Sequence, residues 1–477
     1  MAQLGLLLAT SLLVTLASAV EFITVSGGNF ITNSTGKRFS IIGVDYQPGG
    51  SSGFSTTADP LSDATTCLRD AIMMQQLGVN TIRVYNVDAN LDHSECASIF
   101  NAAGIYMIID VNSGLYGTYI DRTDPASTYT LQYLEHVFGV MENFAPFPNT
   151  LGFFAGNEIL NQNSSYEAPM YIRAVVRDMK DYASHNLGRS IGVGYSAADV
   201  DTMLSDTWNY LGCDLANSST SNIDFFGLND YEWCGDSSFT QSGYNKLVEL
   251  FSGTSIPVFF SEYGCNQVEP RTFTNVPVLY GSEMSVLSGG LVYEYSEEGN
   301  NYGLVDINST SELTVIVDYN YLQEELSQLD IKSLQSINSS ATAAAATSCA
   351  PSLITETNFL NAWDLPTPPS GAAAMITSGV STGFVKGSVV AVTETTMPAT
   401  VVNNTGSTIT GLSLVQLMCT DSNYPGLIKD YTSTSVSCNY ATPGPSASAT
   451  KKSAADKLDV RATSVMLAAL VMLLTLL

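Results

Sequence analysis

Basic side chains are the scarcest feature of this 477-residue sequence, in which 18 lysines and arginines face 45 aspartates and glutamates. The formal net charge of -27 repels phosphate backbones and anionic lipid headgroups. Charged residues of both signs make up 13% of the chain, about half of the roughly 25% usual in globular proteins. We therefore expect no nucleic-acid partner, and a surface wetted by Ser, Thr and Asn or by attached sugar.

Histidine and closely paired cysteines are also rare. The chain has three histidines without clustered spacing, and its eight cysteines form no C-x-x-C pair. We expect neither a metal site nor a cofactor, because structural and catalytic metal sites need such clusters. An even number of widely spaced cysteines favours disulfides formed in an oxidising compartment.

No apolar run reaches the roughly 20 residues that span a bilayer, but both ends carry shorter ones. Residues 1–19 read as a signal peptide that ends at Ala17-Ser18-Ala19. Residues 456–477 read as a signal for a GPI lipid anchor, with Ser453 as the candidate attachment site. Residues 441–455 form a Ser/Thr-rich stalk. The sequence thus predicts an extracellular protein, anchored to the plasma membrane, with six glycosylation sequons: Asn33, Asn163, Asn217, Asn308, Asn338 and Asn403.

The length exceeds what one compact core usually organises, so we expect a large domain with an appendage, or two domains. Short apolar runs alternate with segments of helical period such as Ala64–Leu77 and Pro169–His185. This alternation predicts an α/β (β/α)8 TIM barrel over residues 20–349, while a doubly wound open sheet remains the competing layout. The eight expected strands are Phe39–Tyr46, Asn80–Tyr85, Ile105–Val111, Leu151–Gly156, Ile191–Tyr195, Asp224–Asn229, Pro257–Ser261 and Gly290–Tyr295.

The barrel region is followed by a change in composition. Asn338 to Thr347 reads as a linker or exposed loop. Residues 350–440 alternate Val and Thr between Gly and Pro, which predicts a small β-rich appendage before the stalk.

Glutamates follow two of the expected strands, the fourth and the seventh. Glu158 comes after Leu151–Gly156, and Glu262 comes after Pro257–Ser261. In an eight-stranded barrel the Cα atoms at these two ends are about 14 Å apart, so inward-pointing carboxyl groups approach to about 5 Å. That spacing is typical of retaining glycosidases. We expect Glu262 to be the nucleophile and Glu158 to be the acid and then the base, with Asn157 beside it on the sugar 2-hydroxyl.

Two other motifs offer rival interpretations. Gly192 to Ala197 reads G-x-G-x-x-A after a strand, with Asp214 about 20 residues further on, as in dinucleotide-binding proteins. However, that fingerprint belongs in a first βα unit, and here it follows the fifth strand. Ser196 resembles a hydrolase nucleophile but lacks the final glycine of its motif, and no base is evident among His93, His136 and His185.

Four motifs in order resemble glycoside hydrolase family 72, the fungal GPI-anchored β-1,3-glucanosyltransferases. They are Gly156-Asn157-Glu158, Ser261-Glu262-Tyr263-Gly264-Cys265, Arg83-Val84-Tyr85-Asn86 and Asn229-Asp230-Tyr231-Glu232-Trp233-Cys234-Gly235. The resemblance implies a TIM barrel with Glu158 as acid/base and Glu262 as nucleophile. It also implies donor and acceptor chains of β-1,3-glucan as partners, and a place in the cell wall as well as at the plasma membrane. Matching positions for the sugar-contacting shell are Gln47, Tyr85, Asp110, Asn157, Tyr231 and Tyr293.

The same resemblance implies a disulfide pattern. It suggests pairing Cys67 with Cys96, Cys213 with Cys349 and Cys234 with Cys265, which leaves Cys419 and Cys438 for each other. Two residual cysteines are too few for the cysteine-rich carbohydrate-binding module that some members carry, so the chain resembles the branch without it. We expect a monomer.

The residues alone leave the outcome of the reaction open. Water and a second sugar chain compete for a covalent intermediate, so an endo-β-1,3-glucanase is the first alternative to a transferase. A wall glucan-binding protein without activity is the second.

Overall fold

The computed structural model describes residues 20–336, 345–360, 362–380, 383–418, 421–429 and 431. The predicted signal peptide, the stalk and the GPI signal with Ser453 lie outside the described residues, as do Cys419 and Cys438. Among the described helices, none is long and apolar enough to cross a membrane.

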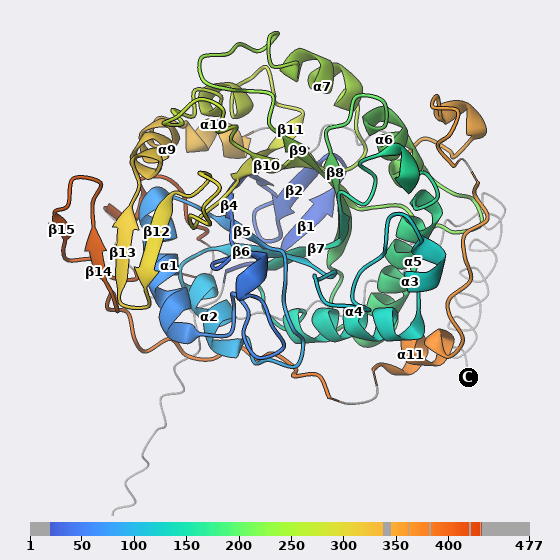
Figure 1. Cartoon of the computed structure of the whole chain (residues 1–477), viewed down its shortest axis with the longest axis horizontal. Helices are drawn as coiled ribbons and strands as arrows, with labels where there is room; N and C mark the ends of the chain where they lie inside the picture. Colours follow the sequence, from blue (N-terminus) through green and yellow to red (C-terminus); the bar gives the residue numbers. More distant parts are fainter. Residues whose placement is uncertain are drawn as a thin grey trace, which may run out of the picture.

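Eight parallel strands close into a barrel in chain order, with the last beside the first (Figure 1). This closed ring confirms the TIM barrel and excludes the open doubly wound sheet. The strands are β4 (Ile41–Asp45), β5 (Thr81–Val84), β6 (Tyr106–Asp110), β7 (Thr150–Asn157), β8 (Gly192–Ala198), β9 (Phe225–Asp230), β10 (Val258–Tyr263) and β11 (Leu287–Val292).

Helices surround the barrel. The longer ones are α1 (Ala64–Leu77), α2 (Ser94–Ala102), α4 (Leu131–Phe144), α5 (Pro169–Asn186), α6 (Leu204–Gly212), α7 (Tyr244–Phe251) and α9 (Val317–Ser327). Short helices are α3 (Pro125–Thr128), α8 (Val276–Leu279), α10 (Ile331–Ser336) and α11 (Ala372–Ser378).

Element boundaries follow local chemistry where caps are present. Helix α1 spans the predicted range because the Asp63 side chain accepts the N–H groups of Thr65 and Thr66, and Gly78 ends it at a φ of 90°. The last barrel strand begins three residues earlier than predicted and ends at Val292. Tyr293 therefore lies in the loop just beyond the strand.

The inward face of the strands is apolar at one end of the barrel. Side chains that alternate along the strands form a central cluster with Phe30, while their neighbours pack outward against the helices. The central cluster includes Ile41, Ile108, Phe154, Phe225, Phe259 and Leu291. This packing leaves the opposite, C-terminal ends of the strands for polar side chains.

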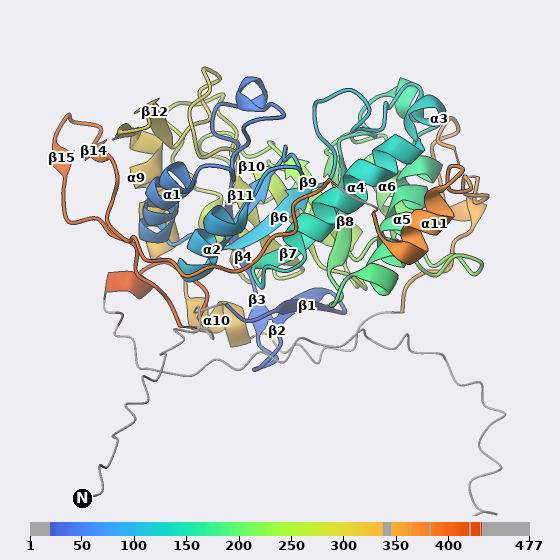
Figure 2. The ribbon, with the colours of Figure 1, turned by 90° about the horizontal axis from the view of Figure 1, so that it is seen from below.

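A small antiparallel sheet closes the apolar end. It consists of β1 (Ile23–Ser26), β2 (Asn29–Thr32) and β3 (Arg38–Phe39). Figure 2 shows this sheet beneath the barrel, on the side away from the 3-10 helix η1 (Ser51–Gly53). From β2, the ring of Phe30 lies 5.8 Å from that of Phe225 and 5.9 Å from that of Phe259. The described residues thus fill this end of the barrel, and a ligand site is expected at the other end.

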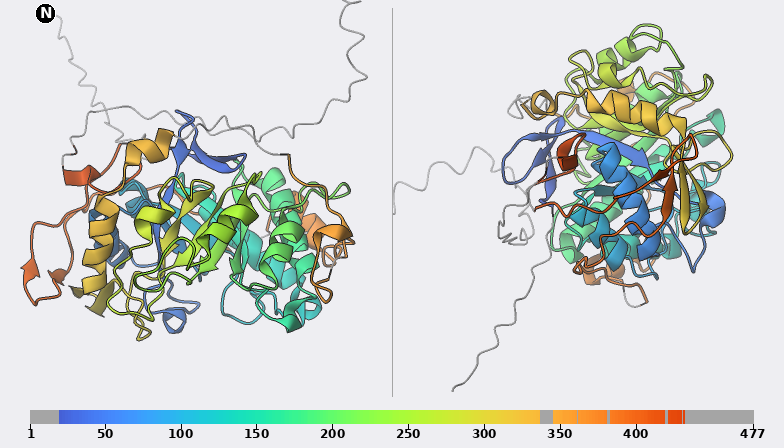
Figure 3. Two further views of the ribbon diagram at one scale, coloured as in Figure 1. Left: turned by 90° about the horizontal axis from the view of Figure 1, so that it is seen from above. Right: turned by 90° about the vertical axis from the view of Figure 1, so that its left-hand side faces the viewer.

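The expected β-rich region after the barrel is present as part of a four-stranded sheet. Strands β14 (Thr400–Val402) and β15 (Thr408–Ile409) extend β12 (Val305–Ser309) and β13 (Glu312–Val315). Most of the remaining described chain from residue 383 to 418 runs as an irregular strap over the helices, from α11 to this sheet (Figures 2 and 3). Backbone bonds such as Val385 N to Ala89 O (2.9 Å) fasten it to the barrel.

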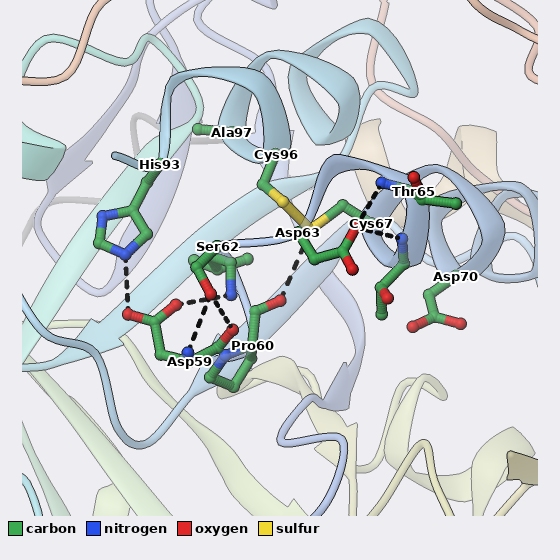
Figure 4. Close-up of a disulfide and its surroundings, with 12 residues drawn as sticks. Asp59, Pro60, Ser62, Asp63, Thr65, Cys67, Asp70, His93, Cys96 and Ala97 are labelled. Carbon is green, nitrogen blue, oxygen red and sulfur yellow. Dashed lines mark hydrogen bonds and ion pairs between the residues drawn. A yellow bond between two sulfur atoms is a disulfide. The ribbon is translucent and has the colours of Figure 1, made fainter. Parts of the chain in front are cut away.

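Three disulfides join distant parts of the chain: Cys67–Cys96, Cys213–Cys349 and Cys234–Cys265. These are the three pairings that the family resemblance implied. Figure 4 shows the first of them linking α1 to α2, close to the buried His93. His93 Nε2 lies 2.8 Å from Asp59 Oδ2, which fixes the loop before α1 to the start of α2. The second closes the longest loop, 136 residues, and so restricts the unfolded chain most.

Candidate active site

A cavity of about 630 Å³ opens over the C-terminal ends of the strands. Loops after β4, β5, β6, β7 and β11 line it, and both Glu158 and Glu262 face into it. Two glutamates that are 104 positions apart in the sequence therefore share one cavity. Its volume lies in the range of small-ligand pockets.

Three charged side chains form the floor of the site at the C-terminal ends of neighbouring strands. Asp45 ends β4, Arg83 lies one residue before the end of β5 and Asp110 ends β6, and all three are buried. Arg83 Nη2 and Nε donate to the two oxygens of Asp110 at 2.9 and 3.1 Å. A bidentate pair of this kind fixes the guanidinium group, whose third nitrogen then reaches Glu262.

Glu262 reaches the cavity because β10 is irregular at this point. Phe259 and Ser261 point inward, so strict alternation would turn Glu262 outward, but a register shift falls between Phe260 and Glu262. Three donors then hold its carboxylate: Arg83 Nη1 (3.2 Å) and Tyr85 OH (2.8 Å) on Oε1, and Tyr231 OH (2.7 Å) on Oε2.

Opposing effects act on the charge of Glu262. Burial raises the pKa of Glu262, and the nearby charge of Glu158 adds to the rise, while Arg83 and the two tyrosine hydroxyls oppose it. Burial also raises the pKa of Tyr85 and Tyr231, so both hydroxyls stay protonated and donate. The three hydrogen bonds thus favour the carboxylate form of Glu262, against the effect of burial.

Glu158 stands at a strained position just beyond β7. Its φ is 47°, the left-handed region that costs a residue with a side chain about 1–3 kcal/mol. The Glu158 backbone N–H donates to Ser196 O (2.9 Å), and Asn229 Nδ2 donates to Glu158 Oε1 (2.9 Å). These bonds aim the carboxyl group, so the strain is maintained where a defined orientation is needed.

The predicted sugar-contacting residues occupy different places. Gln47, Tyr85, Asp110, Asn157 and Tyr293 all line the cavity. Tyr231 is half-buried and bonds the far oxygen of Glu262. Both oxygens of Asp110 are bonded to Arg83, so this carboxylate is not left for a sugar. Gln47 Nε2, in contrast, is buried without a hydrogen-bond partner among the described residues.

Ser196 is part of an amide network and has no histidine base. Its hydroxyl lies 2.8 Å from Asn157 Oδ1, 3.0 Å from Asn229 Oδ1 and 2.9 Å from Ser261 Oγ. With the Asn157 oxygen thus bonded, its side-chain nitrogen is left for a ligand. The G-x-G-x-x-A run containing Ser196 belongs to strand β8 itself, so it forms no phosphate-binding turn.

Sequence reasoning missed Arg83 and Asn229 as site residues, although both lie inside the quoted motifs. The signal that could have found them is their inward position at the polar ends of β5 and β9. The structure also buries the side chain of Glu294 in the cavity wall, at 3% exposure, and no sequence motif pointed to it.

Removing the amide of Asn229 should slow catalysis and also lower stability somewhat, because the hydroxyls of Ser196 and Ser261 lose an acceptor. Asn229→Ala deletes the donor to Glu158 Oε1, and one hydrogen bond to a charged group is worth about 1.5–3 kcal/mol. We expect kcat to fall roughly 10- to 100-fold with KM nearly unchanged. Steady-state kinetics measures kcat and KM, with Asn358→Ala, which changes an exposed asparagine, as the control. An unchanged kcat in Asn229→Ala would show that Glu158 is positioned without Asn229.

A parallel barrel with cavity-facing glutamates after its fourth and seventh strands defines the class of barrel glycosidases. Within that class, the chain belongs to glycoside hydrolase family 72, described as glucanosyltransferase, whose family model matches residues 12–330.

Known relatives extend the match. The chain is 55% identical over 415 residues to 1,3-beta-glucanosyltransferase gel2 of Aspergillus fumigatus, covering 87% of each chain. It is 45% identical over 396 residues to the probable 1,3-beta-glucanosyltransferase GAS3 of Saccharomyces cerevisiae, covering 79% of this chain and 75% of that one. The crystal structure of Saccharomyces cerevisiae Gas2p in complex with laminaripentaose is similar with a TM-score of 0.67 and 36% identity, covering 74% of this chain and 79% of that one.

Proposed function

We propose that this protein is a retaining β-1,3-glucanosyltransferase that cleaves one glucan chain and transfers the released part to the non-reducing end of another. The observation that carries the proposal is Glu262, buried at the wall shared with Glu158 and bonded by three donors that favour its carboxylate form. The family membership and the relatives named as glucanosyltransferases support the same activity.

In the first half of the reaction, a carboxylate oxygen of Glu262 attacks the anomeric carbon. The bond to the leaving glucan oxygen breaks, and Glu158 gives that oxygen its proton. The products are a glycosyl ester on Glu262 and a shortened glucan with a free hydroxyl.

In the second half, Glu158 is a carboxylate and acts as the base. It removes a proton from the hydroxyl of an acceptor chain, whose oxygen attacks the anomeric carbon and breaks the ester. Glu262 is released as a carboxylate and Glu158 is protonated again. The new glycosidic bond keeps the configuration of the old one because two inversions have occurred.

Several residues hold the sugar during these steps. The unpartnered Nε2 of Gln47 and the free side-chain nitrogen of Asn157 can donate to sugar hydroxyls, the latter to the 2-hydroxyl. Tyr293 offers a ring face to a pyranose. Tyr85 and Tyr231 act through Glu262, and Asp110 acts through Arg83, so these three position groups of the site.

The cellular context is part of the same proposal. We infer a mature chain that starts at Val20, with a catalytic domain to residue 349, a β-rich region to residue 440, and a stalk ending in a GPI anchor near Ser453. Such a chain would act outside the cell on wall glucan, at the plasma membrane or in the wall. We propose that it works as a monomer, because the cavity is formed by one chain.

The products of a defined substrate test this function. Purified protein given a reduced laminari-oligosaccharide and a donor laminari-oligosaccharide should form products longer than either starting chain, because the acceptor hydroxyl outcompetes water for the ester. Mass spectrometry of the products measures their lengths. Only shorter products would identify an endo-β-1,3-glucanase, and binding without any product would identify a glucan-binding protein.

A further inference from the structure

Glu294 is another carboxyl group that lines the cavity, and it has no part in the reaction described above. Glu294 follows β11, the strand next to β10, so it lies on the Glu262 side of the cavity. Its side chain is only 3% exposed. Asn300 Nδ2 donates to its Oε1 (2.9 Å), and the hydroxyl of Tyr293 also hydrogen-bonds to the carboxyl group.

The groups that face Glu294 are other carboxyl groups. Glu262 faces it from β10 and Glu298 from its own loop, and Asp45 of β4, whose pKa burial raises well above its usual range, also lies near. The hydroxyl of Tyr293 bonds to the carboxyl group of Glu294, and the backbone carbonyl of Tyr302 accepts the Glu294 N–H (3.0 Å); burial raises the pKa of both tyrosines, so neither carries a charge. Glu297 lies further along the same loop, and its carboxylate accepts hydrogen bonds from backbone N–H groups of that loop.

The nearby guanidinium groups are already occupied. Arg83 is bonded to Asp110 and Glu262. Arg271 is paired with Asp318 (2.7 Å) and donates its other nitrogens to backbone carbonyls, including that of Tyr293. Among the described residues, Glu294 has no ion pair. A buried carboxyl group that faces other carboxylates without a cation is stabilised in its protonated form.

Burial raises the pKa of Glu294 to about 7, with the hydrogen bond from Asn300 opposing the rise and the charge of Glu298 adding to it. Near neutral pH, Glu294 therefore changes between a group that can donate a hydrogen bond and one that can only accept.

We propose that Glu294 binds the donor glucan as a carboxylic acid, donating its proton in a hydrogen bond to a sugar hydroxyl, and that its ionisation weakens glucan binding. The inference rests on the proposed function, because it assumes that glucan occupies the cavity. It deepens that function by assigning a pH-dependent contact to the donor side. Glu158, just beyond β7, instead gives its proton to the leaving oxygen and takes one from the acceptor hydroxyl.

Calorimetric titration of laminaripentaose into the Glu158→Gln variant tests the proposal without turnover. If only the protonated form of Glu294 binds, the apparent Kd should weaken about tenfold between pH 6 and pH 8. Binding at pH 7 should also take up about half a proton per protein molecule. The uptake is measured from the change in the observed binding enthalpy between buffers of different ionisation enthalpy. The added change Glu294→Gln, which keeps a donor but cannot ionise, should make the Kd nearly constant and abolish the uptake.

A matched control is Glu283→Gln in the same background, since Glu283 is an exposed carboxylate and its removal should leave the pH dependence intact. A Kd that does not weaken, or a release of protons on binding, would overturn the inference while leaving the proposed function standing. The same pH dependence with and without Glu294 would also overturn it. Absence of laminaripentaose binding at every pH would overturn both. If the double variant fails to fold, a Glu158→Gln protein that takes up no proton on binding would still overturn the inference.

Discussion

Replacing Glu262 by glutamine is expected to reduce transfer roughly 10⁴-fold or more for every donor, because an amide cannot form the glycosyl ester. Folding should be retained, since glutamine keeps the shape of the side chain and can still bond the hydroxyls of Tyr85 and Tyr231. Glutamine also removes the free-energy cost of burying the charge of Glu262 beside Glu158. The measurement is the rate of product formation with thermal unfolding as the check on folding.

Glu158→Gln should behave differently, and the difference separates the two roles. With natural glucan the rate should fall about 10²- to 10⁴-fold, as for loss of a general acid. With an aryl laminarioside whose phenol leaves without protonation, ester formation should stay fast and the Glu262 ester should accumulate. Equal losses on both donors would contradict the assignment of Glu158 as the acid, and activity of Glu262→Gln on the aryl donor would contradict that of Glu262 as the nucleophile.

Arg83→Met is expected to cause the second-largest loss, in stability as well as in activity. It leaves Asp110 and Glu262 buried without their cation, and breaking a buried ion pair in this way costs about 3–5 kcal/mol. Activity should be nearly abolished, because Arg83 is one of the three donors that keep Glu262 charged.

The stability loss of this variant should depend on pH. Burial raises the pKa of both Asp110 and Glu262 in the folded protein, and Arg83 opposes the rise in each case. Without Arg83 the two groups would bind protons more tightly when folded than when unfolded, so the free energy of unfolding must fall as pH rises above about 4. Denaturant unfolding at pH 4.5 and pH 7 should therefore show the larger deficit at pH 7.

A second change provides the control for Arg83→Met. Adding Asp110→Asn removes one of the two unpaired charges, and we expect part of the lost stability to return without activity. A single variant that is as stable as the parent at pH 7 would show that the Arg83 pairs do not hold the floor of the site.

The barrel could be predicted because its signals are local. Each strand is an apolar run of four to eight residues, and helix α1 has a capping aspartate and a terminal glycine that mark both ends. The glutamates could be located for a related reason, since each is a polar residue directly after such a run.

The orientation of the two glutamates could not be predicted. Strict alternation from Phe259 would turn Glu262 away from the cavity, and the register shift in β10 that corrects this depends on pairing with β9 and β11. The left-handed backbone at Glu158 depends likewise on Ser196 of the neighbouring strand. Such irregularities arise from tertiary contacts between segments distant in sequence.

The same limit applies to the charged groups around the glutamates. Asp45 and Glu294 read as ordinary acidic residues in the sequence, and only their burial beside Glu262 changes their chemistry. The extended strap over the helices was equally invisible, because its Val and Thr residues are typical of strands while its backbone bonds go to helices and loops.

The most direct test of the account is to trap the covalent intermediate and find where it is attached. A laminari-oligosaccharyl donor with a 2-fluoro substituent and a good leaving group forms the ester quickly but releases it slowly, because the fluorine destabilises both transition states. Peptide mass spectrometry should then show one glycosyl adduct, on the peptide that contains Glu262 and on its carboxyl group. An adduct on any other residue, or continued turnover of this donor without an adduct, would contradict Glu262 as the nucleophile.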